Sequence, residues 1–489
     1  MTLHDVEQEV RTGLFINGQA SPGAGEMTVQ NPADPGSPVG VAAAASRDEA
    51  LSAAAAAKAA FPAWAARSPQ ERGGQLDAAL NVLESFKEED AAILSRENGK
   101  ILMEAAIDLM VFNARFGLAS GLANEVATTT VLPGPPADTT VSYKPLGVVT
   151  IIVPFNWPLA ILAASLPYAL ITGNTVVVKP PPSAPLATTR VVQRVAEQLP
   201  PGVLNVVTGK DDEIGEALVS SPDVAKVCFT GSPGGGKRIM SMASGTLTRV
   251  TLELGGNDPA LILDDADLSD AALDGLFHGV FDSTGQICMA AKRLYVHRSR
   301  YQQVIDGLSA RLEHTVLGRG TDAGTTMGPL HSGAQKKFVA DLVDEARAAG
   351  AEVREFGQLP ADTSLAEGNF LRPTLVLDPD PNLGVVTEEQ FGPTIPIIPF
   401  DEDDHAIAAA NDTWAGLCAS VWTQDRTRAA AVGNQLMAGY VFVNNHGAHA
   451  LDERVPFGGF KGSGMGREMG IEGIREFMDT HSLALPPEG

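Results

Sequence analysis

The sequence has 489 residues, with 35 Lys and Arg against 59 Asp and Glu, and its formal net charge is −24. This length corresponds to about three domains of ordinary size, or to fewer large ones. The content of 44% hydrophobic and 19% charged residues excludes a disordered or fibrous chain. Because the negative charge repels phosphate backbones and anionic headgroups, we expect neither nucleic acid nor a membrane surface as a partner.

Three cysteines are too few for a disulfide framework and favour a reducing compartment, so we expect a cytoplasmic protein. The first 15 residues are acidic and lack an apolar run, which argues against a signal peptide. Residues 145–178 carry no charge and are long enough to span a bilayer. Prolines interrupt this segment, however, and we expect buried strands and a helix there instead.

In chain order, the alanine-rich residues 41–67 predict a surface helix. Ser68, Pro69 and Glu71 have the spacing of a capping box with proline at the first helical position, and they predict a second helix that ends near residue 85. Residues 88–118 have helical spacing of apolar residues, and residues 139–143 favour a strand.

Between residues 147 and 252, short apolar runs alternate with helical stretches. The predicted strands are 148–153, 175–178, 203–207, 224–229 and 249–252. The predicted helices are 158–171, 185–198, 213–219 and 235–244. This alternation predicts a doubly wound parallel sheet with a ligand crevice at the carboxyl ends of its strands. A second region, 264–467, repeats the pattern with longer helices such as 334–349. Two α/β domains with a cleft between them are the simplest architecture.

A glycine-rich segment, 231–236, follows one predicted strand and precedes a helix, which is a typical context for binding a phosphate. Its spacing nearly matches a P-loop, but Arg238 stands where a P-loop needs Ser or Thr. It does not match the usual dinucleotide pattern either. From the spacing alone, phosphate binding and a purely structural turn both remain open.

Cys288 lies in a segment of small and polar residues, and exposure of its thiol would suit a nucleophile. Cys228 and Cys418 lie in apolar strands and are predicted to be buried core residues. Glu253 follows a strand directly and precedes two glycines, so it is either a general base or a turn residue. Asn156 between two prolines suits either an oxyanion donor or a loop hydrogen bond. The nine histidines have no metal-ligand spacing, so we expect no metal.

Seven segments together resemble the aldehyde dehydrogenase superfamily, in the family's order and over nearly the whole chain: 154–158, 178–180, 229–232, 253–256, 285–288, 389–393 and 456–461. The resemblance implies an α/β fold with a Rossmann-like cofactor-binding domain, an α/β catalytic domain and a small β oligomerisation flap. The corresponding ranges are 1–124 and 146–254 for NAD(P) binding, 255–469 for catalysis, and 125–145 with 470–489 for oligomerisation.

The resemblance also implies the chemistry. Cys288 would attack the aldehyde carbon, and Asn156 with the Cys288 N–H would hold the oxyanion. Hydride transfer to nicotinamide would leave a thioester, which water activated by Glu253 would hydrolyse. The residues that would contact the cofactor are Phe155, Lys179, Gly231, Ser232, Glu389 and Phe391.

Two features bear on specificity. NAD-preferring members commonly have a glutamate three residues after the lysine, whereas this chain has Pro182. The carboxylate would repel a 2′-phosphate, so its absence predicts that both NAD and NADP work. Ile287, Met289 and Trp157 predict an apolar pocket and an aliphatic or aromatic aldehyde.

The alternative functions are a semialdehyde dehydrogenase and a CoA-acylating aldehyde dehydrogenase. CoA-acylating members usually lack the base that Glu253 would supply.

Residues 139–143 and 480–485 resemble the oligomerisation element, so we expect a homodimer or homotetramer.

Overall fold

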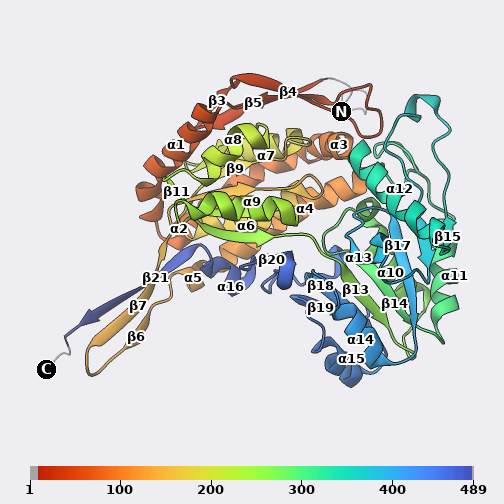
Figure 1. Cartoon of the computed structure of the whole chain (residues 1–489). Coiled ribbons are helices and arrows are strands. Elements are labelled where there is room, and N and C mark those ends of the chain that lie inside the picture. The colour runs from red at the N-terminus through yellow and green to blue at the C-terminus, as the bar shows by residue number, and fades with distance from the viewer. Residues whose placement is uncertain (1–8, 487–489) are drawn as a thin grey trace.

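The computed structural model describes residues 9–486, which form an α/β fold with four β-sheets (Figure 1). The α/β fold class predicted from the sequence is confirmed. Two large sheets dominate, and two three-stranded sheets lie at the periphery. Among residues 9–486, none of the helices combines the length and the apolar character needed to cross a bilayer.

The largest sheet has eight strands in the order β20-β12-β11-β8-β9-β10-β2-β3. Five neighbouring strands are parallel and match the predicted ones: β8 (Val148–Ile152), β9 (Thr175–Lys179), β10 (Leu204–Val206), β11 (Val224–Thr230) and β12 (Arg249–Glu253). Antiparallel strands complete the sheet: β2 (Leu14–Ile16), β3 (Gln19–Ser21) and β20 (Gly464–Met465). The connecting helices are α6 (Pro158–Ile171), α7 (Leu186–Ala196), α8 (Asp211–Val219) and α9 (Pro233–Ser244).

Helices cover both faces of this sheet, as a doubly wound arrangement requires. Val149 and Ile151 of β8 point into the core that contains α6 and α7. Val148 and Ile152 point to the opposite core, which contains α8 and α9. The uninterrupted apolar run of β8 is therefore explained by burial on both sides.

The second large sheet has seven strands in the order β15-β16-β17-β14-β13-β18-β19. All are parallel to their neighbours except β15: β13 (Asp258–Ile262), β14 (Ala291–His297), β15 (Glu352–Glu355), β16 (Thr374–Leu377), β17 (Thr394–Phe400), β18 (Cys418–Trp422) and β19 (Tyr440–Val443). Its helices are α10 (Asp270–Phe281), α11 (Tyr301–Leu312), α12 (Gly333–Ala348), α13 (Gly384–Thr387), α14 (Asp403–Asn411) and α15 (Arg426–Gly433). Short 3₁₀ turns lie at Asp282–Gly285, Thr363–Leu365, Ala448–Ala450 and Lys461–Ser463.

The first predicted helix is partly wrong, because its alanine-rich beginning is a strand. β5 (Gly40–Ala44) pairs with β1 (Val10–Thr12) and β4 (Gly25–Val29), and α1 begins only at Arg47 and runs to Ala65. Ala42 and Ala43 are buried in this small sheet, so tertiary pairing outweighs the helix propensity of alanine. The start of α1 is set by a capping box between Ser46 and Glu49.

The next predicted helices exist but are interrupted. The Ser68 capping box forms, and α2 (Pro69–Leu80) continues as the 3₁₀ turn Asn81–Phe86. The predicted helix 88–118 consists of α3 (Lys87–Asn98) and α4 (Leu102–Gly121). Gly99 separates them with φ = 99°, a left-handed cap conformation that glycine adopts without steric cost.

A three-stranded antiparallel flap projects from the body of the molecule (Figure 1). Its central strand β7 (Asp138–Pro145) lies between β6 (Thr130–Leu132) and the C-terminal strand β21 (Met478–Leu485). The short helices α5 (Ala123–Val126) and α16 (Gly470–Arg475) precede β6 and β21 in the chain. The two strands expected from the sequence therefore pair with each other across more than 300 positions of chain.

Candidate active site and cofactor cavity

A cavity of about 1070 Å³ opens at the carboxyl ends of the parallel strands of the eight-stranded sheet. This is where a doubly wound sheet binds its ligand. Most of the predicted site residues line the cavity: Phe155, Asn156, Lys179, Gly231, Ser232, Cys288, Glu389 and Phe391. Pro182 lines it as well, whereas Glu253 is not among the lining residues.

The backbone around Cys288 is held in an unusual conformation. Ser283 and Thr284 have φ values of 54° and 58°, and Gly285 follows with φ = 72°. A side chain at Gly285 would place its Cβ 2.2 Å from the carbonyl oxygen of Gly392, so only glycine permits this approach. The Lys292 ammonium donates to the carbonyl oxygens of Ile287 and Ala290 on either side of the cysteine. The loop that presents Cys288 is therefore fixed at both ends.

Burial raises the pKa of the Cys288 thiol to about 12. The positive charge of Lys292 lowers this pKa, while the carboxyl groups of Glu389, Asp258 and Glu253 raise it further. Cys288 is only partly buried, whereas the other two cysteines are fully buried in β11 and β18, as predicted. Cys288 is thus the accessible thiol, and it needs a base to ionise at neutral pH.

Asn156 lies directly beside the cysteine loop. Its side-chain N–H donates to the carbonyl oxygen of Gln286 at 2.9 Å. Behind it, the Asn98 amide donates to the carbonyl oxygens of Phe155 and Asn156. The Asn156 bond joins the turn that follows β8 to the turn that precedes Cys288, and the Asn98 bonds join the first of these turns to the end of α3. An asparagine amide has two N–H donors, and Gln286 takes one of them.

Glu253 is the last residue of β12, and its side chain is buried. Within residues 9–486, neither of its carboxyl oxygens has a hydrogen-bond partner. Burial and the nearby Glu468 raise its pKa well above the usual range, and Arg467 lowers it. The segment that follows Glu253 reaches the nucleophile, since a Cβ on Gly256 would lie 2.7 Å from the carbonyl oxygen of Cys288. A buried carboxyl group without partners is a candidate acid–base residue.

The opposite end of the cavity has the features of an anion site. Ser232 caps α9, and its hydroxyl oxygen accepts the Gly235 N–H at 3.1 Å. Gly234, in the first turn of α9, faces open space, because an added Cβ would meet only the Ser232 hydroxyl at 4.0 Å. A helix N-terminus with such an uncrowded approach fits the pyrophosphate of a dinucleotide. The residues present therefore fit NAD or NADP.

Glu389 and two aromatic rings lie between these ends. The Gly256 N–H donates to the Glu389 carboxyl group at 3.2 Å, and burial raises the pKa of Glu389 to about 7. The Phe155 ring stacks on His331 at a centroid distance of 4.0 Å and meets Phe391 edge-on at 6.1 Å.

Several polar residues of the site escaped sequence reasoning. Lys292 and His331 belong to no recognisable motif. Lys292 lies four residues after Cys288, whereas only the fold brings His331 to Phe155. Asp211 forms an ion pair with Lys179. The sequence gives little reason to assign Asp211 to the site, because acidic residues are common at the start of helices.

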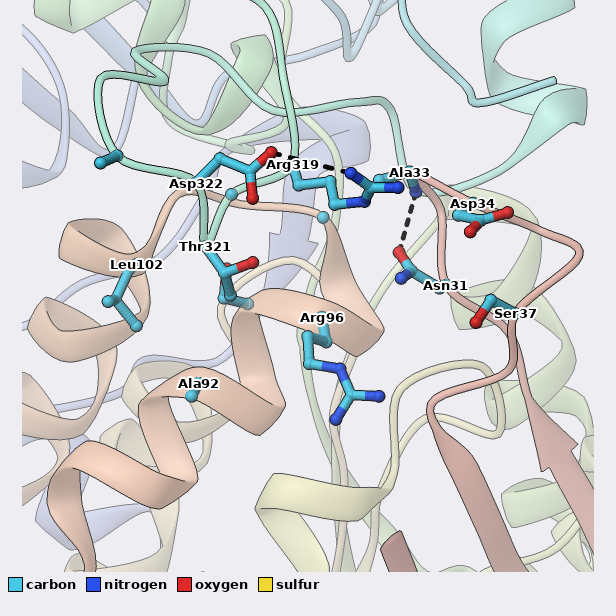
Figure 2. A pocket seen from close by; sticks show the side chains of 14 residues that line it. Asn31, Ala33, Asp34, Ser37, Ala92, Arg96, Leu102, Arg319, Thr321 and Asp322 are labelled. Carbon is cyan, nitrogen blue, oxygen red and sulfur yellow. Dashed lines mark hydrogen bonds and ion pairs between the residues drawn. The ribbon is translucent and has the colours of Figure 1, made fainter. Parts of the chain in front are cut away.

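A second cavity, of about 910 Å³, lies between the 31–37 loop, α3 and the 319–323 loop (Figure 2). None of the predicted site residues lines it. Its Arg319 side chain forms ion pairs with Asp322 and Asp362. Across residues 9–486, no group of three or more His, Cys, Asp or Glu side chains is arranged to hold a metal ion.

Comparison with known proteins agrees with this geometry. The model of the aldehyde dehydrogenase family matches residues 19–483. An aldehyde dehydrogenase of Davidiella tassiana is 34% identical over 99% of this chain and 97% of its own. Phenylacetaldehyde dehydrogenase of Pseudomonas fluorescens is 36% identical over 86% of this chain and 85% of its own.

Solved structures agree as well. A putative aldehyde dehydrogenase of Burkholderia cenocepacia superposes with a TM-score of 0.94 at 36% identity, over 98% of both chains. Betaine aldehyde dehydrogenase of Staphylococcus aureus, in complex with NAD+, has a TM-score of 0.93 at 30% identity, over 99% of this chain and 97% of its own. The chain therefore belongs to the aldehyde dehydrogenase family and is an oxidoreductase that acts on aldehydes.

Proposed function

We propose that the protein oxidises an apolar aldehyde to its carboxylic acid through a covalent intermediate on Cys288. This proposal rests on one observation: the cavity that Cys288 and Asn156 line is also lined by residues suited to bind a dinucleotide. They comprise the N-terminus of α9, Lys179 and Glu389.

The first step is the attack of the Cys288 sulfur on the aldehyde carbon. Because the pKa of the thiol is about 12, the sulfur is protonated at neutral pH, and its proton must pass to a base as the C–S bond forms. Glu253 is suited to take it, since its buried carboxyl group has a raised pKa and no competing hydrogen bond within the described chain.

The negative charge that develops on the aldehyde oxygen needs donors. The second N–H of the Asn156 amide and the backbone N–H of Cys288 supply them at the same loop junction. Because the Asn98 and Gln286 bonds already hold Asn156, little reorganisation accompanies the reaction.

Bound NAD(P) supplies the acceptor for the hydride that leaves the carbon. Lys179, Ser232 and the N-terminus of α9 would hold its adenosine and pyrophosphate parts, and Glu389 with Phe391 the nicotinamide ribose and ring. Before the second stage, Glu253 passes the thiol proton to solvent and is a carboxylate again. Water then attacks the thioester on Cys288, and Glu253 takes the proton of that water. The C–S bond breaks, Glu253 returns the proton to the Cys288 sulfur, and the carboxylic acid leaves.

Apolar side chains line the same cavity as Cys288, among them Ile161 and Leu254. Cys288, Trp157 and Ile161 pack against the core cluster that contains Ile287 and Met289. Arg115, which donates to the carbonyl oxygen of Ala160 in α6, is an unsuitable partner for a substrate carboxylate, because its guanidinium already forms hydrogen bonds with both carboxyl oxygens of Glu453. Both observations favour an aliphatic or aromatic aldehyde over a semialdehyde acid.

Substitution of Cys288 by alanine tests the mechanism. We expect Cys288→Ala to lower kcat for aldehyde oxidation by more than about 10³-fold, while the Kd for NAD stays within roughly twofold. Cys228→Ala is the matched control, because it removes a buried thiol of β11 and should leave oxidation intact. Activity that survives Cys288→Ala would refute the covalent mechanism.

An aldehyde panel tests the substrate class and the product. Hexanal, benzaldehyde and phenylacetaldehyde should react with higher kcat/KM than succinic semialdehyde or betaine aldehyde. A preference for the carboxylated or the cationic aldehyde would overturn the assignment of the pocket as apolar. The product should be the free acid whether or not CoA is present, and acyl-CoA as the product would favour the acylating alternative.

A further inference from the structure

The Lys179 side chain in the cofactor cavity is already paired with an acidic residue. Lys179 ends β9, and its ammonium forms an ion pair with the carboxylate of Asp211, the first residue of α8. The lysine side chain is only 2% exposed, whereas that of Asp211 is 73% exposed. Both residues line the cavity, so the free face of the Asp211 carboxylate is accessible from it.

The same region contains Pro182 where NAD-preferring relatives commonly have a glutamate. From the sequence alone, this proline removes the carboxylate that would repel a 2′-phosphate. In the fold, however, Asp211 supplies a carboxylate to the lysine that the glutamate would have accompanied. The carboxylate that is absent at position 182 is present instead at the first residue of α8.

We infer that Asp211 is a specificity-determining residue that makes the protein prefer NAD to NADP. This inference rests on the proposed function, in which Lys179 holds the adenosine ribose. The Asp211 carboxylate accepts a hydrogen bond from a ribose hydroxyl. It disfavours a 2′-phosphate in two ways, by direct repulsion and by occupying the Lys179 ammonium.

The other charges around the pair support this assignment. Asp212 and Glu216, on the same helix, also line the cavity, and Arg238 on α9 is the other cation of the lining beside Lys179. A 2′-phosphate adds about 1.5 to 2 negative charges at pH 7 and would lie among these carboxylates. The hydroxyl of NAD brings no charge and has an acceptor in Asp211.

Direct binding measurements test the inference without relying on catalysis. The Kd values for NAD and NADP are measured by isothermal titration calorimetry on the full chain and on Asp211→Asn. We expect the wild-type protein to bind NAD at least about tenfold more tightly than NADP, and Asp211→Asn to bind NADP roughly 10- to 100-fold more tightly than the wild type does. Its affinity for NAD should fall only a few-fold.

Glu213→Gln is the matched control. Glu213 lies in the same turn of α8 and carries the same charge, but it pairs with Lys210 and does not line the cavity. This control should leave the ratio of the two Kd values within about twofold. Adding Pro182→Glu to Asp211→Asn should restore the preference for NAD, because it returns a carboxylate to the position used by relatives.

The outcomes separate this inference from the proposed function. Equal wild-type affinity for the two dinucleotides, or the same change of ratio in Asp211→Asn and Glu213→Gln, would overturn the role of Asp211 and leave the aldehyde oxidation standing. Failure of the wild-type protein to bind either dinucleotide would overturn the proposed function, and this inference with it.

Discussion

The proposed mechanism depends on a few buried titratable residues whose pKa values are shifted by neighbouring charges. Glu253 is the main example, because burial and the charge of Glu468 raise its pKa while Arg467 lowers it. Glu468 is itself buried and accepts the Ser165 hydroxyl at 2.6 Å. The two neighbours of Glu253 therefore act in opposite directions on the same carboxyl group.

The opposite effects of Glu468 and Arg467 on the pKa of Glu253 give a prediction for the pH dependence of kcat. A base works only when deprotonated, so a lower pKa of Glu253 extends activity to lower pH. Glu468→Gln removes a like charge and should move the acid limb of the profile to lower pH. Arg467→Gln removes an opposite charge and should move that limb to higher pH. The measurement is kcat against pH for the three proteins with one apolar aldehyde.

The pair of variants provides its own control. A general disturbance of the site would move both profiles in the same direction or only lower their plateaus. Either result would contradict the assignment of Glu253 as the base whose ionisation limits activity at low pH.

At the scale of the elements, the N-terminus of α7 is held by a residue of another helix, Glu97 of α3. The Glu97 carboxyl group on α3 is fully buried, and its two oxygens accept hydrogen bonds from the N–H groups of Leu186 and Ala187 at 2.7 and 2.8 Å. These are the first two residues of α7, whose own N-cap, Pro185, provides no side-chain hydrogen bond. Glu97 therefore caps α7 from outside and anchors the 180–185 loop that borders the cofactor cavity.

We predict that Glu97→Ala lowers the free energy of unfolding by about 2–5 kcal/mol, because it leaves two buried N–H groups without acceptors. Glu97→Gln keeps one carbonyl oxygen and should cost less. Thermal unfolding followed by circular dichroism measures both variants. Equal melting temperatures of the wild-type protein and Glu97→Ala would refute the capping role.

The same residue predicts a pH effect. Burial raises the pKa of Glu97 from 4.5 to about 8. The folded state therefore binds more protons than the unfolded state between these values, and the contribution of Glu97 to stability falls as pH rises through them. Glutamine does not titrate, so the difference in melting temperature between the wild-type protein and Glu97→Gln should narrow as pH rises from about 5 to 8. A constant difference would contradict the raised pKa.

At the scale of the whole molecule, the flap formed by β6, β7 and β21 is the feature that favours association with another subunit. Its strands leave apolar side chains exposed at two edges, with Val131 and Leu132 on β6 and Leu483 and Leu485 on β21. An open strand edge with exposed apolar residues favours pairing with another chain. We therefore predict a homodimer or homotetramer.

Light scattering coupled to size exclusion tests this prediction. The molar mass should be two or four times 51.0 kDa. Val131→Lys combined with Leu132→Lys should shift the protein towards the monomer, because two charges would be buried at the interface. Leu247→Lys, at a residue that is 89% exposed and outside the flap, is the control and should leave the mass unchanged. A wild-type monomer would contradict the prediction.

The sequence by itself determined the local elements and the type of chemistry. The parallel strands, the helices between them and the Ser68 capping box are set by short-range patterns, which periodicity and capping chemistry reveal. The family motifs likewise predicted Cys288, Asn156 and Lys179 as site residues, and these three residues line one cavity. Prediction failed at residues 41–45, where alanine alone favours a helix and only pairing with β1 and β4 decides for a strand.

Only the tertiary structure decided which distant side chains act on one another. It brought Asn156 to the turn before Cys288, Glu97 to the start of α7, and Asp211 to Lys179. It also placed the Asp211 carboxylate of α8 beside Lys179, which is the basis for the proposed preference for NAD. The reason is physical: burial and electrostatic coupling depend on distance in space, which the order of residues along the chain does not specify.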